Sequence, residues 1–464
     1  MNKKYSIFMA AMCGVLTFTG CSGQTNTASE AVTQEENTAA VVESTEQKDE
    51  EAPSGLVYEE NEKLAAAVDA VAYSYVQSSL ATDNNKVVPG AQVLVLKDGK
   101  IVLKKAYGVQ QAFDWTSGEG VLLENTVPMQ TTTMIDLASC TKISATTQAV
   151  MKLVTEGKLD VKEKVATYLP EFGQNGKENV TVEELLTHTS GLPQWRPMFL
   201  YCDTKEEVLD YICNTSLMFE PGEYYYSDLG FLTLGFLVEK VSGQSLDAYV
   251  KTNIYEPLGM VKTGYLPLEN GIAKEEIAAS SFGNPYEYCM VDEENYPDFG
   301  YDCTEDKEAF AAFDGWRNYT LIGEVNDGNA GMGCKGVAGH AGVFSNVEEL
   351  AILYQALLDG GSYNGVELYS PEVLAQFTTD RMSEGQGCYG FATGSSWMIA
   401  LSDTAFGHNG FTGQYITVDP KNQIVTILLT NKMNAGLTEE HMYNNLTDFA
   451  KAFNNAVHNE YVAE

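Results

Sequence analysis

The pattern of hydrophobic and polar positions predicts strands near both ends of the chain. Two apolar runs, at 92–96 and 101–107, flank Asp98-Gly99, a dipeptide typical of a tight turn between antiparallel strands. A second pair, at 414–419 and 423–430, is separated by a short polar segment that contains a proline. The sequence therefore predicts two β-hairpins, one early and one late in the chain.

Apolar residues at helical spacing predict helices at 61–79, 144–155 and 439–458. Strands at both ends with helices between them indicate an α/β (α+β) fold, an antiparallel sheet flanked by terminal helices with an inserted all-α lobe. The stretch 272–327 is rich in Tyr, Asp, Glu and Asn and has weak periodicity. We expect it to be a long loop that rims a cleft between the two lobes and shapes substrate choice.

The first 21 residues have the features of a bacterial lipoprotein signal peptide. Lys3 and Lys4 precede an apolar segment at 7–18 that is too short to span a bilayer, and Cys21 follows it. Cys21 is the candidate lipidation site, which predicts a membrane-anchored protein at the bacterial cell surface or in the periplasm. The alternative is an ordinary secretory signal with an unmodified cysteine.

The next segment, 22–55, is rich in Thr, Glu, Ala and Ser and shows no periodicity. Such a composition cannot bury enough apolar surface to fold, so a disordered acidic tether is expected. Residues 56–464 are long enough for one large two-lobed domain and show no second break in composition.

Charge and cysteine content exclude several classes of function. The formal net charge of −36 over 464 residues argues against nucleic acid or an anionic membrane face as a partner. Nine cysteines without C-x-x-C spacing predict neither a zinc site nor a full disulfide framework, although Cys202 with Cys213, or Cys289 with Cys303, are candidate pairs. Metalloprotease, Walker and dinucleotide motifs are absent, so no metal and no cofactor are expected.

Three short motifs carry candidate chemistry. In Ser139-Cys140-Thr141-Lys142, a helix that begins at Ser139 would place Lys142 on the same face one turn on, as a serine nucleophile and an adjacent base require. Alone, this pattern also fits a helix-capping serine beside an exposed lysine. Tyr226 lies in PGEYYYSDLG just before an apolar helix, and His408-Asn409-Gly410 comes just before the late hairpin.

Serine, lysine and tyrosine followed by a strand edge resemble the serine penicillin-recognising enzymes, in the branch of the class C β-lactamases. The segments DLASCTK, LLTHTSGLP, YEPLGM and GHNGFTG extend this resemblance from about Gln92 to Asn431. The stretch GEVNDGNAGMGCKGVAGHAGVFSN is similar to the type-4B penicillin-binding proteins, assigned as D-alanyl-D-alanine carboxypeptidases, and to related muramoyl-alanine amidases. Asn326 stands where those proteins typically have a histidine.

The resemblance implies that Ser139 forms an acyl-enzyme, with an oxyanion hole made by the backbone N–H groups of Ser139 and Phe411. Lys142 and Tyr226 compete for the role of base, and neither is a good base at its ordinary pKa. A charged Asp228 near Lys142 would favour the ammonium form. We therefore favour Tyr226 as the proton acceptor and Lys142 as its electrostatic partner.

Histidines supply the remaining candidates. His408 replaces a lysine that is usual in relatives, and it is expected either to contact a substrate carboxylate when charged or to relay a proton to Tyr226. Asn409 and Gly410 complete that motif. His340, in GVAGHAG, is expected to buttress the site by hydrogen bonding, and Cys140 to be a small buried side chain.

These features predict an exported serine hydrolase, a penicillin-binding DD-carboxypeptidase-like enzyme that acts on peptidoglycan peptides. A serine amidase, an esterase or a D-amino-acid peptidase of the same fold is the first alternative. A β-lactamase is the second, and a non-catalytic lipoprotein that binds wall fragments is the third.

Overall fold

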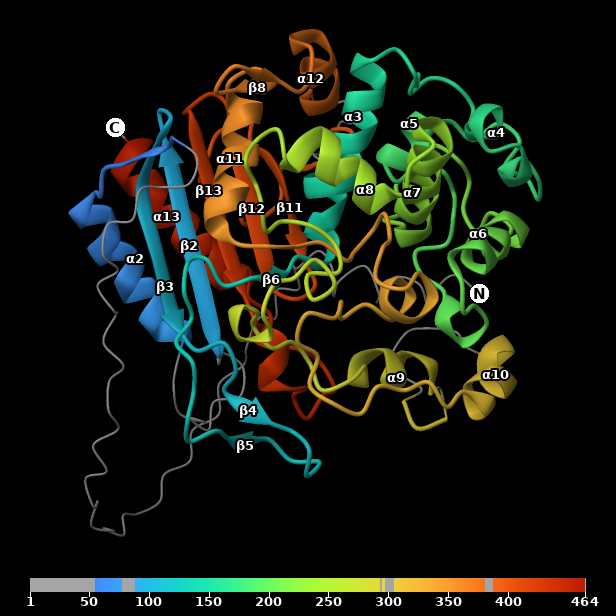
Figure 1. The fold of residues 1–464 in the computed structure, drawn as a ribbon, viewed down its shortest axis with the longest axis horizontal. Helices are drawn as coiled ribbons and strands as arrows, with labels where there is room; N and C mark the ends of the chain where they lie inside the picture. Colours follow the sequence, from blue (N-terminus) through green and yellow to red (C-terminus); the bar gives the residue numbers. More distant parts are fainter. Residues whose placement is uncertain (1–54, 77–87, 293, 297–303, 380–386, 464) are drawn as a thin grey trace, which may run out of the picture.

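The computed structural model describes residues 55–76, 88–292, 294–296, 304–379 and 387–463 (Figure 1). The expected signal peptide with Cys21, and nearly all of the expected tether, lie outside these residues. None of the helices described is long and apolar enough to cross a membrane.

A seven-stranded sheet forms one side of the molecule, with the strand order β1-β3-β2-β13-β12-β11-β10. Its neighbours pair antiparallel, except that the two-residue edge strand β1 runs parallel to β3. The strands are β1 (Val57–Tyr58), β2 (Gly90–Lys97), β3 (Lys100–Gly108), β10 (Ala392–Thr393), β11 (Phe406–Gly410), β12 (Gln414–Asp419) and β13 (Ile424–Thr430).

Both predicted hairpins are present, and they meet at the centre of the sheet, where β2 pairs with β13. The early turn is tight because Asp98 and Gly99 both adopt positive φ angles, 50° and 77°. Side chains of β2 alternate between the two faces, so that Val93 packs into one hydrophobic core and Leu94 into another.

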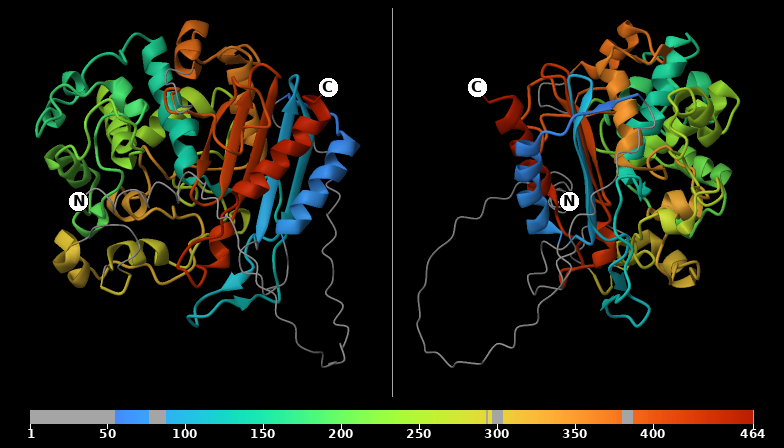
Figure 2. Two further views of the ribbon diagram at one scale, coloured as in Figure 1. Left: turned by 180° about the vertical axis from the view of Figure 1, so that it is seen from behind. Right: turned by 60° about the vertical axis from the view of Figure 1, so that its left-hand side comes forward.

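Terminal helices cover one face of the sheet, as the sequence predicts. Helices α2 (Glu62–Tyr75) and α13 (Thr447–Tyr461) pack against each other there, while α11 (Val347–Leu358) and the helical lobe lie on the opposite face (Figure 2). The last helix begins eight residues later than expected, because Asn445 accepts a hydrogen bond from the Thr447 N–H and ends the preceding loop. His441 therefore precedes α13 instead of lying on it.

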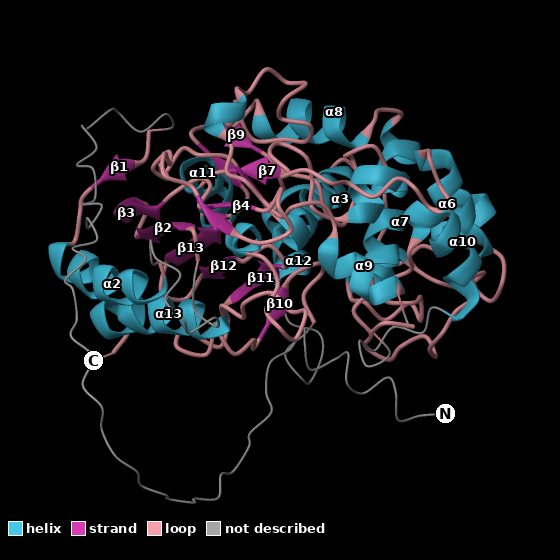
Figure 3. Cartoon of the chain, turned by 90° about the horizontal axis from the view of Figure 1, so that it is seen from below, coloured by secondary structure: helices cyan, strands magenta, loops and turns pink. Residues whose placement is uncertain are grey.

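The inserted helical lobe lies beside the sheet at the other end of the molecule (Figure 3). At its centre is α7 (Asp228–Ser242), which is buried from Asp228 to Val238. The expected helix at 144–155 is present as a π-helical turn, Lys142–Thr146, followed by α3 (Thr147–Thr155). The other helices are α4 (Val165–Tyr168), α5 (Val182–Leu186), α6 (Lys205–Asn214), α8 (Leu246–Val250), α9 (Pro285–Val291), α10 (Lys307–Ala312) and α12 (Pro371–Thr378).

The described residues also form three two-stranded sheets: β4 (Phe113–Asp114) with β5 (Val121–Leu122), β6 (Ile135–Asp136) with β7 (Phe344–Ser345), and β8 (Ser362–Tyr363) with β9 (Val366–Glu367). The pairing of β6 with β7 matters most for function. It holds the segment before Ser139 against the segment that follows His340.

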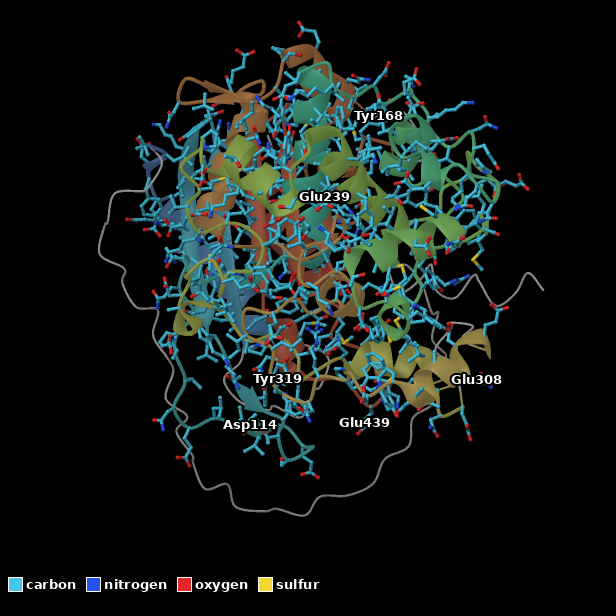
Figure 4. The ribbon with its side chains drawn as sticks, turned by 45° about the vertical axis from the view of Figure 1, so that its right-hand side comes forward. Asp114, Tyr168, Glu239, Glu308, Tyr319 and Glu439 are labelled. Carbon is cyan, nitrogen blue, oxygen red and sulfur yellow. The ribbon has the colours of Figure 1, made fainter. Side chains whose placement is uncertain are left out.

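The described parts of the stretch 272–327, which are 272–292, 294–296 and 304–327, are more ordered than the sequence suggests. They contain α9 and α10, which pack through aromatic contacts such as Tyr288 against Phe310, with ring centroids 5.3 Å apart. Glu308 on α10, Tyr319 and Glu439 lie along one edge of the molecule (Figure 4). Aromatic side chains, which weak periodicity does not reveal, pack the described helices of this segment together.

Cys202 and Cys213, a candidate pair, form no disulfide, because both thiols are free and buried. Cys202 precedes α6 and Cys213 lies in its last turn, so the helix, rising ~1.5 Å per residue, holds them too far apart for a disulfide. Cys289 is also free, and Cys303 lies outside the described residues.

Candidate active site

The segment that carries Ser139 leaves β6 through a constrained turn. Ala138 has a φ of 45°, and its N–H donates to Asp136 Oδ1 at 2.9 Å. The chain then forms a short 3-10 turn and enters the π-helical turn, so that Lys142 comes back towards Ser139. The adjacency that the S-x-x-K spacing predicts is present, with Lys142 Nζ 3.1 Å from Ser139 Oγ.

Lys142 is fully buried, and its three ammonium donors all have acceptors. Besides Ser139 Oγ, Nζ contacts Asp228 Oδ1 at 2.7 Å and the His340 carbonyl oxygen at 3.2 Å. A buried charge requires a counter-charge and hydrogen bonds, and Asp228 together with His340 provides both. The predicted contact between Asp228 and Lys142 is therefore present as an ion pair.

Tyr226 lies beside this pair, with its ring centroid 4.9 Å from Lys142 Nζ. Burial and the charge of Asp228 raise the pKa of Tyr226 well above its ordinary value, while contact with Ser139 opposes the shift. The resting side chain is thus a neutral phenol. The next residue holds it in place, because Ser227 caps α7 and donates its N–H to His188 Nδ1 at 3.0 Å.

His408 is placed near Tyr226 by β11, with ring centroids 6.0 Å apart. Its Nδ1 lies 2.6 Å from the Asn409 carbonyl oxygen, so Nδ1 carries a proton and donates it. Burial, together with the charge of Lys142, lowers the pKa of His408 to about 3. Near neutral pH His408 is therefore uncharged. Its contact with a substrate carboxylate when charged, and the alternative proton relay to Tyr226, stay predictions.

The turn after β11 is held against the nucleophile. A Cβ at Gly410 would lie 2.6 Å from the Leu137 carbonyl oxygen, so only glycine allows this approach. Thr412 Oγ1 donates to the Asp136 carbonyl oxygen at 2.9 Å. Phe411, whose N–H is the expected second oxyanion donor, lies between these two contacts.

His340 is buried, and its Nε2 lies 2.9 Å from Asp327 Oδ1. The predicted role as a hydrogen-bonding buttress agrees with this contact and with the bond from Lys142 to the His340 carbonyl. Although burial opposes it, the charges of His340 and Lys142 lower the pKa of Asp327. Sequence reasoning assigned no role to Asp327, although it lies in the motif GEVNDGNA next to Asn326.

The Cys140 thiol does not compete with Ser139 as a nucleophile. It is fully buried, with Sγ 3.5 Å from the His408 carbonyl oxygen. Burial raises the pKa of the thiol, so little reactive thiolate forms. Within the described part of the chain, no cluster of His, Cys, Asp and Glu side chains could hold a metal ion.

Comparison with known proteins identifies a family and related chains. The family profile "Beta-lactamase" matches residues 66–448. A protein of Escherichia coli K12 named "Putative D-alanyl-D-alanine carboxypeptidase" is 34% identical over 366 residues, 74% of this chain and 78% of that one. A Bacillus subtilis protein named "N-acetylmuramyl-L-alanine amidase" is 34% identical over 365 residues, 74% and 77% of the two chains.

Among solved structures, a penicillin-binding protein homologue from Caulobacter crescentus superposes with a TM-score of 0.61 at 20% identity. The superposition covers 88% of this chain and 99% of that one. At this level of identity the likeness shows the fold. The predicted fold class is confirmed.

Asp228 gives a test of the electrostatics. Asp228→Asn removes the counter-charge of Lys142 and one cause of the raised pKa of Tyr226, so the phenol loses its proton at lower pH. We expect the basic limb of the pH–rate profile for labelling by a serine-reactive fluorophosphonate to move down by roughly one to three pH units. Asp69→Asn, which breaks the part-exposed pair with Lys105, is the control. An unmoved limb would contradict this account.

Proposed function

The chain belongs to the Beta-lactamase family of serine hydrolases, and from this membership we propose that it hydrolyses amide bonds of peptidoglycan peptides through an acyl-enzyme on Ser139. One observation carries the proposal. Lys142 Nζ contacts Ser139 Oγ at 3.1 Å while it is ion-paired with Asp228 in a buried site. A serine in such surroundings is set up as a nucleophile and not as a surface hydroxyl.

In the proposed acylation, Ser139 Oγ attacks the carbonyl carbon of the scissile amide. The N–H groups of Ser139 and Phe411 stabilise the oxyanion. Tyr226 rests as a neutral phenol, so its oxygen becomes basic only as its own proton passes to the leaving amine, and in the same step it accepts the serine proton. The ammonium of Lys142 stabilises the charge that develops on the phenol oxygen. Water then hydrolyses the ester by the same relay in reverse.

We propose a DD-carboxypeptidase-like activity as the specific reaction, in which the terminal D-alanine of a wall peptide is the leaving group. The name of the Escherichia coli relative supports this choice. The substrate would carry a free carboxylate next to the scissile bond. His408 would then bind that carboxylate as a neutral hydrogen-bonding group, since its pKa is lowered to about 3.

A muramoyl-alanine amidase is the second candidate, and the neutral state of His408 favours it. In an amidase substrate the scissile amide is followed by further peptide, so no free carboxylate lies beside that bond. Such a substrate does not require a positively charged side chain at position 408. The Bacillus subtilis relative, which bears the amidase name, is as similar to this chain as the carboxypeptidase relative.

Two substrates distinguish these activities, diacetyl-L-Lys-D-Ala-D-Ala and N-acetylmuramoyl-L-Ala-D-isoglutamine. We expect the protein to cleave the first substrate. The kcat/KM for the tripeptide, divided by the kcat/KM for its C-terminal methyl ester, should stay constant from pH 5.5 to 7.5. His408→Lys should raise that ratio roughly fivefold, since an ion pair with a net value of ~1 kcal/mol changes binding by about that factor. Cleavage of the muramoyl substrate alone would establish the second candidate. A ratio that falls through pH 6–7 would show that His408 titrates there.

The nucleophile is tested by Ser139→Ala, which should lower fluorophosphonate labelling and hydrolysis by about 10³-fold or more. Circular dichroism and thermal unfolding should match the parent protein. Cys140→Ala is the matched control, because its buried thiol lies next to the nucleophile, and it should still be labelled. Intact-protein mass spectrometry gives the stoichiometry. Full labelling of Ser139→Ala would rule Ser139 out as the nucleophile.

We further propose that the protein is exported and anchored to the membrane by lipid on Cys21. The charged and then apolar segment before Cys21 supports this. Cys21→Ser should release the protein from the membrane fraction or leave the signal uncleaved. Unchanged fractionation, with no acyl mass at the N-terminus of the parent protein, would refute the anchor.

A further inference from the structure

The carboxylate of Asp136 joins two segments that border the nucleophile. Its Oδ1 accepts the Ala138 N–H at 2.9 Å, and its Oδ2 accepts the Asn326 N–H at 2.7 Å. The side chain is buried, and none of the ion pairs found among the described residues includes it. Two backbone amides, and no cation at ion-pair distance, hold this buried carboxylate.

Ala138 needs such a partner, because its φ of 45° lies in the left-handed region. Residues with a Cβ, other than Asn and Asp, enter that region at a cost, and they remain there where surrounding contacts impose it. The bond from the Ala138 N–H to Asp136 is such a contact. Ser139 comes directly after Ala138, so this backbone angle sets the direction of Oγ.

Asn326, the second donor to Asp136, lies next to Asp327, which contacts His340 Nε2. The His340 carbonyl in turn accepts a hydrogen bond from Lys142. The same carboxylate thus holds the nucleophile turn on one side and the segment that supports Lys142 on the other.

We propose that Asp136 is a positioning residue, whose ionised carboxylate holds Ala138 in its left-handed conformation and thereby aims Ser139 Oγ at Lys142. This inference rests on the proposed role of Ser139. The carbonyl of Asp136 separately accepts hydrogen bonds from Thr412 and Gln414, and a side-chain substitution leaves those intact. Substitution therefore isolates the carboxylate.

Ionisation of Asp136 is expected to appear in the activity. Burial raises the pKa of Asp136 to about 6, and the two N–H groups that donate to it oppose this shift. Two charged groups of the 317–327 segment also act on it: Asp327 raises the pKa and Arg317 lowers it. The partner strand β7 and the side chains of Thr412 and Gln414 are neutral. Below about pH 6 the group is protonated and becomes a weaker acceptor for the Ala138 N–H.

The same shift separates activity from stability. Because the folded pKa is higher than the unfolded one, the protonated form favours folding, and stability falls as the pH rises from about 4 to about 6. At neutral pH the charged carboxylate therefore weakens the fold while it positions the nucleophile. A residue that only held the fold together would show the opposite.

The test compares fluorophosphonate labelling rates from pH 5 to 9 in Asp136→Asn, Ala138→Gly and the double variant. We expect Asp136→Asn to label about 10- to 100-fold more slowly, as a small misplacement of a reacting atom causes, and to lose the acid limb near pH 6. Its melting temperature at pH 7.5 should not fall. The double variant should label at close to the parent rate, because glycine at position 138 adopts a positive φ without the hydrogen bond to Asp136.

Two controls separate the possible failures. Asp419→Asn removes another buried carboxylate, which accepts hydrogen bonds from Ser402 and Asn422; it should lower stability and leave the labelling profile unchanged. If Ser139→Ala is still labelled, the proposed function fails. The role of Asp136 is overturned if Ser139→Ala is not labelled while Asp136→Asn keeps the labelling rate and acid limb of the parent protein. It is also overturned if the double variant labels no faster than Asp136→Asn. In both cases the proposed function stands.

Discussion

The buried ion pair between Lys142 and Asp228 is the constraint on which the rest of the site depends. Taking both charges out of water costs several kcal/mol per ion, which only close contact and further hydrogen bonds offset. The two charged groups are 2.7 Å apart, and the His340 carbonyl oxygen accepts a hydrogen bond from the ammonium. Asp228 is also the first residue of α7, where the helix dipole favours a carboxylate.

That pair requires three segments to approach closely. A Cβ at Gly339 would lie 2.0 Å from the Phe231 carbonyl oxygen, so the segment before His340 packs directly on the backbone of α7. Gly235 faces it from the helix, and a Cβ there would lie 3.0 Å from the Gly339 Cα. Small residues at this contact bring the His340 carbonyl within reach of Lys142.

One buried cation also sets the protonation of its neighbours. Its charge adds to burial in lowering the pKa of both His188 and His408, so these rings stay neutral. The carboxylate of Asp228 acts in the opposite sense and adds to burial in raising the pKa of Tyr226. The pair of Lys142 and Asp228 therefore lies close to neutral rings, those of Tyr226, His188 and His408, which suits the transfer of single protons between adjacent atoms.

What the sequence alone determined was local. The turn at Asp98-Gly99 follows from two residues that tolerate positive φ, and the contact of Ser139 with Lys142 follows from a spacing of one helical turn. Tertiary structure decided whatever depends on burial or on contact between distant segments. Asp136 binds Asn326 across 190 positions. His408 is uncharged because burial lowers its pKa and because Lys142, 266 positions earlier in the chain, lies close to it. No local pattern records such proximity, since desolvation and charge act through space and not along the chain.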